Sequence, residues 1–319
     1  MTGRELVLAT FAHETVPSVP WVPFAGVHAG RLIGEKADAL YRDAGLVSRA
    51  LREAHRLYHP DGMPVMFDLQ LEAEALGCDL LWSGDAPPTV TSHPLESDGA
   101  IPDRLPQPSD GRLAVALEAT RTITAELGES TALYGLFCGP FTLASHLRGT
   151  TIFMDMFDDP DYVKRLVAYA TDVATHMARL YREAGVHVLA SVDPLVSQIS
   201  PDHFTEFLHE SYTRLFQEIR AMGVPSSFFV CGDATKNVEV MCKTGPDGIS
   251  IDENINLPSA KEITDRYNIV LAGNIPLASV MLFGNQQDNM KVTLDIMDSV
   301  DHHNLIVSPG CDMPYDVPP

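Results

Sequence analysis

The feature that most constrains the fold is a regular alternation of short apolar runs with longer helical periods along the 319 residues of the chain. Eight of these runs have the length and the β-branched or aromatic content of buried parallel strands. They lie at residues 21–25, 64–68, 133–137, 186–192, 227–231, 248–252, 269–272 and 305–308. Eight strands that alternate with helices favour a single (β/α)₈ TIM barrel over an open sheet.

Between most of these runs, apolar residues recur at steps of three and four, which is typical of amphipathic helices. The periods at 161–184 and 201–222 are long enough for right-handed crossovers between parallel strands. Residues 92–111, rich in Pro, Asp and Ser, predict one long loop beside the barrel mouth. We therefore expect one domain over residues 1–319. The sequence stops just after the last predicted strand, so we expect the final barrel helix to be missing from it.

Composition and charge exclude several classes of partner. The formal net charge is −21, which repels phosphate backbones and anionic membranes, so nucleic acid is not an expected partner. No apolar run approaches the roughly 18–20 residues of a membrane span, and the first residues lack the layout of a signal peptide. The five cysteines are scattered and odd in number. We expect a protein of the reducing cytoplasm, where thiolate chemistry is favoured over disulfides.

Polar or thiol side chains follow seven of the eight predicted strands. In a barrel these strand ends open into one cavity, so residues far apart in sequence can act on the same ligand. Two of them, Cys231 and Cys311, follow a β-branched run and adjoin a glycine, which makes them candidate zinc ligands. The residues at the seven ends are Asp68, Cys138, Asp193, Cys231, Asp252 with Glu253, Asn274 and Cys311.

Four segments of the chain resemble the uroporphyrinogen decarboxylase superfamily. They are Gly-Pro-Phe-Thr-Leu-Ala-Ser at 139–145, Asp-Pro-Leu-Val-Ser-Gln-Ile-Ser-Pro-Asp-His-Phe at 193–204, Leu-Ala-Gly-Asn-Ile-Pro at 271–276 and Ser-Pro-Gly-Cys-Asp-Met-Pro at 308–314. The decarboxylases carry an arginine-rich N-terminal motif, whereas the stretch from residue 22 here has no arginine until Arg31. The chain is therefore more similar to the methyltransferase branch, related to methylcobalamin:coenzyme M methyltransferases.

The zinc motif of that branch is His-x-Cys followed much later by a second Cys. The resemblance places Cys231 and Cys311 on the two cysteines and Phe229 on the histidine. Because a zinc site normally has at least three protein ligands, another donor is needed, and Glu253 or Asp252 can supply it. Zinc held in this way would act as a Lewis acid on a substrate sulfur or oxygen. The next candidates for the third ligand are His146, Asp68 and Asp233.

A phenylalanine beside the metal makes the pocket drier and flatter, which favours an arene as the substrate. The first hypothesis is therefore zinc-dependent O-demethylation of an aryl methyl ether, with the methyl group passed to cobalamin. The chain has no Asp-x-His-x-x-Gly cobalamin pattern, so the cobalamin is expected on a separate corrinoid protein. The alternatives are methyl transfer from methylcobalamin to a thiol such as coenzyme M, and a decarboxylase-like or non-catalytic barrel.

In the first hypothesis Glu253, or Asp252, binds or protonates the ether oxygen. Asp193 and Asp68 are the other catalytic candidates, although aspartates at such turns are more often helix caps. The pair His302-His303 precedes the last strand, at the opposite end of the barrel, and is interpreted as structural. The candidate substrate-binding residues are Phe24, Phe141, His146, Phe229 and Asn274.

Overall fold

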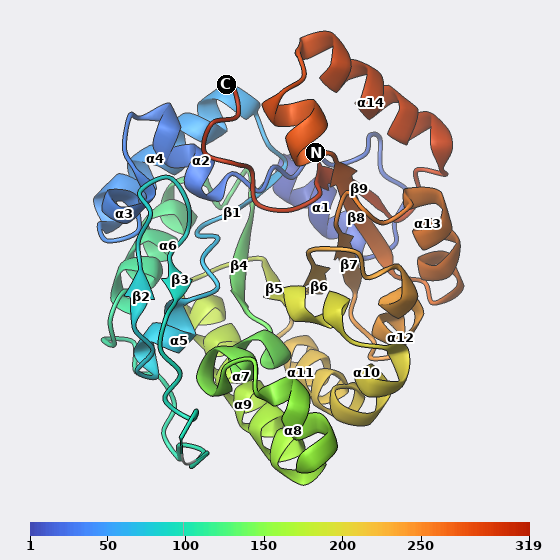
Figure 1. Ribbon diagram of the computed structural model, residues 1–319. Helices are drawn as coiled ribbons and strands as arrows, with labels where there is room; N and C mark the ends of the chain where they lie inside the picture. Colours follow the sequence, from blue (N-terminus) through green and yellow to red (C-terminus); the bar gives the residue numbers. More distant parts are fainter. Residues whose placement is uncertain (98) are drawn as a thin grey trace.

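The computed structural model describes residues 1–97 and 99–319, and a parallel sheet of seven strands ringed by helices lies at its centre (Figure 1). The order of the strands in the sheet is β1-β4-β5-β6-β7-β8-β9. Their bounds are β1 (Gly62–Pro64), β4 (Ala132–Cys138), β5 (Val188–Val192), β6 (Ser226–Val230), β7 (Gly248–Ile251), β8 (Val270–Ile275) and β9 (Leu305–Pro309). Two short strands, β2 (Leu80–Leu81) and β3 (Thr89–Val90), form a separate antiparallel pair.

The expected eighth strand, at 21–25, is reduced to a single bridge between Trp21 and Val307, so the prediction of eight strands is wrong by one. Prolines at 20 and 23 cannot donate to a ladder, which limits pairing in this segment. The segment nevertheless bonds to both edges of the sheet. The Val22 amide donates to the Val307 carbonyl (3.0 Å), and the Asp61 amide donates to the Trp21 carbonyl (2.9 Å).

The other expected strands are present, with ends that are shifted by a few residues. The largest shift is in β1, which ends at Pro64, where the expected strand begins. The expected helix at 161–184 is α9 (Pro160–Glu183). The expected helix at 201–222 is divided at Leu208 into α10 (Pro201–Phe207) and α11 (His209–Ala221).

The remaining helices and helical turns surround the sheet or cap its ends. They are α1 (Gly3–Phe11), α2 (Gly26–Leu32), α3 (Ala37–Leu40), α4 (Ala44–Tyr58), α5 (Leu71–Ala75), α6 (Leu113–Leu127), α7 (Pro140–Arg148), α8 (Ile152–Asp158), α12 (Val238–Cys242), α13 (Leu257–Arg266) and α14 (Gln286–Ser299), with the 3₁₀ turns η1 (Pro194–Gln198) and η2 (Thr235–Asn237) and the π-helix η3 (Leu277–Leu282).

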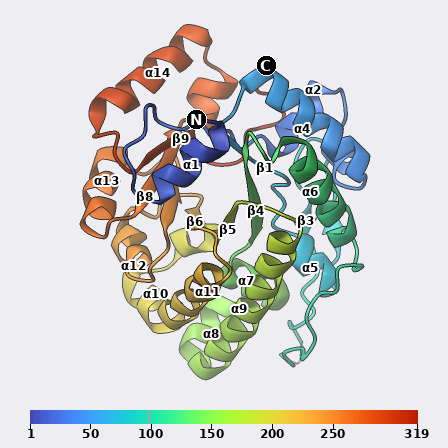
Figure 2. The ribbon, with the colours of Figure 1, turned by 180° about the vertical axis from the view of Figure 1, so that it is seen from behind.

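Two apolar clusters stabilise this arrangement. The larger one extends from Ala25 to Val317 and lies mainly between the sheet and its helices. The smaller one fills the space enclosed by the strands, and its large side chains include Phe24, Phe67 and Phe229. Helix α1 crosses the amino ends of the strands (Figure 2) and adds Val7 and Phe11 to the smaller cluster. The interior is therefore closed at its amino end, and a site is expected at the carboxyl ends.

Residues 92–111 contain no helix or strand in their described part, and Asp98 lies outside the described residues. The Leu95 amide donates to the Leu147 carbonyl at the end of α7 (2.9 Å), and the Tyr169 hydroxyl on α9 donates to the Arg104 carbonyl (2.7 Å). The expected long loop is thus present, and it packs against α7 and α9. Among the described helices, none combines the length and the apolar character that a bilayer crossing requires.

Candidate active site

The two candidate zinc ligands lie next to each other at the carboxyl ends of the strands. Cys231 directly follows β6, and Cys311 follows β9 after Gly310, although β7 and β8 lie between these strands in the sheet. Their sulfur atoms are joined as a disulfide, with 6.0 Å between the Cα atoms. Both residues are half-buried. The fold thus brings the two cysteines together across the strand ends, as a bonded pair rather than as two separate thiols.

Phe229, which the resemblance places on the histidine of the zinc motif, lies in β6 two residues before Cys231, so the two side chains point to the same face. Its ring is fully buried and lies 4.8 Å from the ring of Phe24 and 5.7 Å from that of Phe67, measured between centroids. Cys231 and Cys311 pack on the cluster that contains these rings. The three aromatic side chains therefore form an apolar floor beneath the cysteine pair, and they fill space that an arene substrate would need.

The candidate third ligands are bonded to backbone amides. One oxygen of Asp252 accepts from the Gly232 amide (2.8 Å), and the other accepts from the Asn254 amide (2.9 Å). Glu253 Oε2 accepts from the Leu277 amide at the start of η3. Both carboxylates therefore stabilise the loops around the strand ends.

The donor set does not fit a zinc site. Within residues 1–97 and 99–319, no group of three or more His, Cys, Asp or Glu side chains is placed to hold a metal ion. Of the further candidates, Asp233 accepts from the Thr235 amide and hydroxyl, and His146 lies on α7. Two thiols with no third ligand fall short of the three protein ligands that structural and catalytic zinc sites have.

Asp68 follows β1 and forms a buried ion pair with Arg112. Arg112 Nη1 donates to Asp68 Oδ2, and Arg112 Nε donates to Glu74 Oε2 (2.8 Å). The guanidinium also lies over the ring of Trp82, 4.8 Å from its centroid. No sequence pattern marks Arg112, because it lies just after the long loop, where a basic residue is normally exposed. Asp68 is therefore held in a charged network that fixes its orientation.

Asp193, the second catalytic candidate, is fully buried after β5 and accepts four hydrogen bonds. Its donors are the Phe141 amide (2.8 Å), the Thr142 amide (3.1 Å), the Thr142 hydroxyl (2.6 Å) and the Tyr212 hydroxyl. Burial raises the pKa of Asp193, whereas these donors lower it. The carboxylate thus joins the first turn of α7 to α11. This is a helix-capping role, which is the more common one for an aspartate at such a turn.

The remaining candidates for substrate binding are placed as follows. Phe141 is fully buried, with its ring 5.8 Å from that of Phe153, in the cluster between sheet and helices. Burial lowers the pKa of His146 to about 4, so its imidazole is neutral at pH 7. Asn274 Nδ2 donates to the carbonyls of Asp252 (2.9 Å) and Ile255 (2.7 Å), and this fixes the loop after β7. Asn274 is thus linked to the cysteine pair through Asp252, whose carboxylate accepts from the Gly232 amide next to Cys231.

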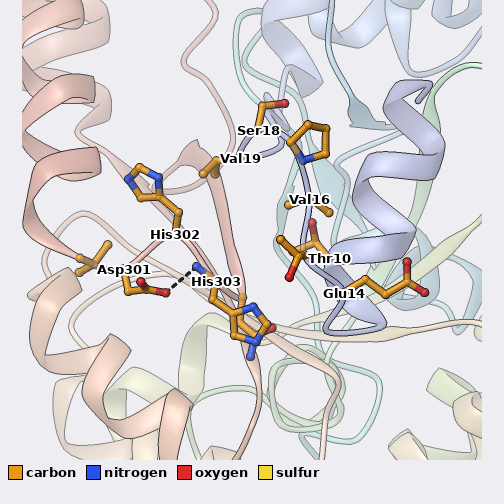
Figure 3. Close-up of a pocket in the computed structure, with 12 residues that line it drawn as sticks. Thr10, Glu14, Val16, Ser18, Val19, Asp301, His302 and His303 are labelled. Carbon is orange, nitrogen blue, oxygen red and sulfur yellow. Dashed lines mark hydrogen bonds between the residues drawn. The ribbon is translucent and has the colours of Figure 1, made fainter.

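A separate pocket of about 430 Å³ lies at the other end of the strands (Figure 3). Thr10, Glu14, His302 and His303 line it, and the His303 amide donates to the Asp301 carboxylate (2.8 Å). Since His302 and His303 precede the first residue of β9, this pocket is at the amino end, as expected for the pair. It is distinct from the site around Cys231.

Glu72, on α5, is a buried carboxyl that no sequence motif marks. Its Oε1 accepts from the Cys138 amide (3.0 Å), and its Oε2 is buried with no hydrogen-bond partner among the described residues. Burial raises the pKa of Glu72 to about 7. Folding therefore favours the protonated carboxyl over the carboxylate. The contribution of Glu72 to the free energy of unfolding is complete below the ordinary pKa of 4.5 and is lost as the pH rises through about 7.

We expect Glu72→Gln to raise the free energy of unfolding at pH 8 by up to roughly 3 kcal/mol and to change it little at pH 5. The amide retains the acceptor for the Cys138 amide and has no charge to bury. Urea unfolding at both pH values measures the difference. Glu118→Gln, at an exposed position on α6, is the control and should show no such pH dependence. A Glu72→Gln variant that is less stable than the parent at pH 8 would contradict this expectation.

Comparisons with known proteins agree with the expected branch. The chain is 24% identical over 304 residues to methylcobamide:CoM methyltransferase MtbA of Methanosarcina acetivorans. The matched region covers 93% of this chain and 88% of that protein. It is 28% identical to methylcobamide:CoM methyltransferase MtaA of Methanosarcina barkeri, over 97% of this chain and 92% of that protein. Uroporphyrinogen decarboxylase of Myxococcus xanthus is 26% identical over 67% of this chain and 63% of its own length.

Among solved structures, a methyltransferase from Methanosarcina mazei has the same fold, with a TM-score of 0.90 over 100% of this chain and 95% of that chain at 24% identity. The expected resemblance to the methylcobalamin:coenzyme M methyltransferases is thus confirmed, and these relatives are enzymes. The model of the uroporphyrinogen decarboxylase family matches residues 2–319. The chain therefore belongs to the uroporphyrinogen decarboxylase family.

Proposed function

We propose that this chain is a methyltransferase that moves a methyl group from a methylcobamide, carried by a separate corrinoid protein, to a small thiol. The observation that supports this most directly is the meeting of Cys231 and Cys311 at the strand ends, in a chain similar along nearly its whole length to methylcobamide:CoM methyltransferases. These relatives favour the thiol alternative over the O-demethylation of an aryl methyl ether, which was the first hypothesis.

The aromatic residues give a second reason for preferring the thiol. The arene hypothesis depended on a dry, flat pocket beside Phe229. The ring of Phe229 instead packs against Phe24 and Phe67, and all three are buried. Since close-packed rings leave no room for another ring, a reactant would have to bind beside the half-buried cysteines, and a small, flexible thiol suits that position better than an arene.

In the proposed reaction the thiolate sulfur attacks the methyl carbon in line, and cobalt departs with the electron pair of the broken bond. The residues of the chain bind and orient the two reactants, which supplies much of the acceleration. The apolar floor closes the site from below, so both reactants approach from the carboxyl ends of the strands. Asp252, Glu253 and Asn274 hold the loops that border this approach. No step is assigned to zinc, because the described His, Cys, Asp and Glu side chains do not form a site with three metal ligands.

The test is methyl transfer by the purified, reduced chain. Methylcobalamin with 2-mercaptoethanesulfonate should give the methyl thioether and cob(I)alamin, followed by mass spectrometry and by the cobalamin spectrum. Cob(I)alamin with a methoxyphenol should give much less methylcobalamin. We expect Cys231→Ser to lower the first rate by at least about tenfold, because its side chain lies where the reactants meet.

Cys242→Ser is the matched control, since Cys242 is buried on α12, away from the strand ends. A higher rate with the methoxyphenol would favour O-demethylation over the thiol reaction. No transfer in either direction would favour the non-catalytic barrel.

A further inference from the structure

Besides its place beside the reactants of the proposed methyl transfer, the cysteine pair has redox chemistry of its own. Cys231 and Cys311 are 80 residues apart in sequence and belong to strands that are not neighbours, yet their sulfurs are bonded. The other three cysteines, Cys78, Cys138 and Cys242, are free and buried. The pair is half-buried at the open end of the strands, so small molecules in solution can reach it.

The surroundings of the pair favour a reaction between the two sulfurs over metal binding. The resemblance places Phe229 where the zinc motif has its histidine. The Phe229 ring is buried and has no atom that can bind a metal. Asp252 uses both carboxylate oxygens on backbone amides. Two adjacent thiols without a third ligand are not protected by a metal, and an accessible pair of this kind exchanges readily with other disulfides. A disulfide in a reducing compartment is usually transient and redox-active rather than structural.

We propose that Cys231 and Cys311 are a reversible dithiol–disulfide pair that reacts with low-molecular-weight disulfides, and that the disulfide form does not transfer methyl groups. The second half of the proposal rests on the proposed function. The oxidant is then the disulfide of the same class of compound as the thiol substrate. A cell that has oxidised its thiol pool would thereby stop the enzyme that consumes thiol.

The exchange balances without any other reactant. One cysteine thiolate attacks the external disulfide, which forms a mixed disulfide and releases one external thiol. The second cysteine then attacks the mixed disulfide, which closes the Cys231–Cys311 bond and releases the second external thiol. The pair loses two electrons and two protons, and the external disulfide gains them as two thiols. The closed bond ties the end of β6 to the loop after β9, across the position where the reactants meet.

The first measurement counts thiols. The purified chain is equilibrated with mixtures of reduced and oxidised glutathione, freed of glutathione, denatured and titrated with dithionitrobenzoate. Because the chain has five cysteines and the bond uses two, we expect five thiols in the reduced form and three in the oxidised form. Mass spectrometry of non-reduced peptides should show residues 231 and 311 cross-linked. Cys242→Ser should still lose two thiols, and Cys311→Ser should carry a glutathione adduct on Cys231 in place of the cross-link.

The second measurement compares methyl transfer in the two forms. We expect the oxidised chain to transfer methyl groups from methylcobalamin at less than about a tenth of the rate of the reduced chain, and dithiothreitol to restore the rate. Five thiols at every glutathione ratio would overturn the exchange, as would one zinc per chain that blocks it. Loss of two thiols with an unchanged rate would overturn the gating. If the fully reduced chain transfers nothing, the proposed function and the gating fail together, while the thiol count still decides the exchange.

Discussion

Replacement of Arg112 by methionine is expected to lower the free energy of unfolding by about 3–5 kcal/mol, the usual cost of removing one partner from a buried ion pair. The Arg112 side chain is 7% exposed and that of Asp68 is 0% exposed. Without the guanidinium, the Asp68 carboxylate retains only the Gln70 amide as a hydrogen-bond donor among the described residues. Since water cannot solvate it there, the uncompensated charge destabilises the folded state.

Two further variants make this expectation specific. The double variant Arg112→Met with Asp68→Asn removes both buried charges and should recover most of the lost stability, since a buried pair that is removed as a whole costs little and the Glu74 carboxylate left behind is 28% exposed. Arg52→Met is the matched control, because the pair that Arg52 forms with Glu126 is 47% and 40% exposed, and we expect a loss of at most about 1 kcal/mol. Chemical unfolding measures all three. Equal losses in Arg112→Met and Arg52→Met would show that the buried pair does not have this role.

The second large effect is expected for Asp193→Ala, which should lower the free energy of unfolding by about 4 kcal/mol or more, because each buried donor left without an acceptor costs about 1–3 kcal/mol. The variant deprives the amides of Phe141 and Thr142 and the hydroxyls of Thr142 and Tyr212 of their common acceptor. Tyr212→Phe removes one of these donors, and we expect it to cost about 1 kcal/mol.

Thermal and urea unfolding of both variants checks the order of the two losses. A loss in Asp193→Ala no larger than that in Tyr212→Phe would mean that the carboxylate is not the centre of this network. The result also bears on Asp193 as a catalytic candidate. A carboxylate that is fully occupied by four donors positions the first turn of α7, and through it the edge of the site, and has no lone pair directed at the opening.

The fold and much of the candidate site follow from short-range patterns in the sequence. Apolar runs and helical periods predict the strands and helices, because side-chain direction repeats every two residues in a strand and about every 3.6 in a helix. Once a parallel sheet of this kind is expected, the residues that follow each strand are expected at one end of it. The convergence of Cys231 and Cys311 follows from that step alone.

The same patterns were insufficient where the backbone pairing is weak. Residues 21–25 have the composition of a strand, but they form one bridge, because prolines on both sides of Trp21 and Val22 remove donors from the ladder. The division of the expected helix at Leu208 has no counterpart in its apolar period. Both differences arise from individual backbone groups, which a periodicity summed over a segment does not resolve.

The sequence by itself determined the parallel αβ architecture, the family resemblance and the end of the sheet at which the cysteines meet. Only the tertiary structure decided what each polar group contacts: the bond between Cys231 and Cys311, the buried ring of Phe229 beneath them, and the pairing of Asp68 with Arg112, 44 residues later in the chain. The physical reason is one of range. Periodicity reports on neighbours within a few residues, whereas burial, hydrogen-bond partners and ion pairs depend on packing between segments that are distant in sequence.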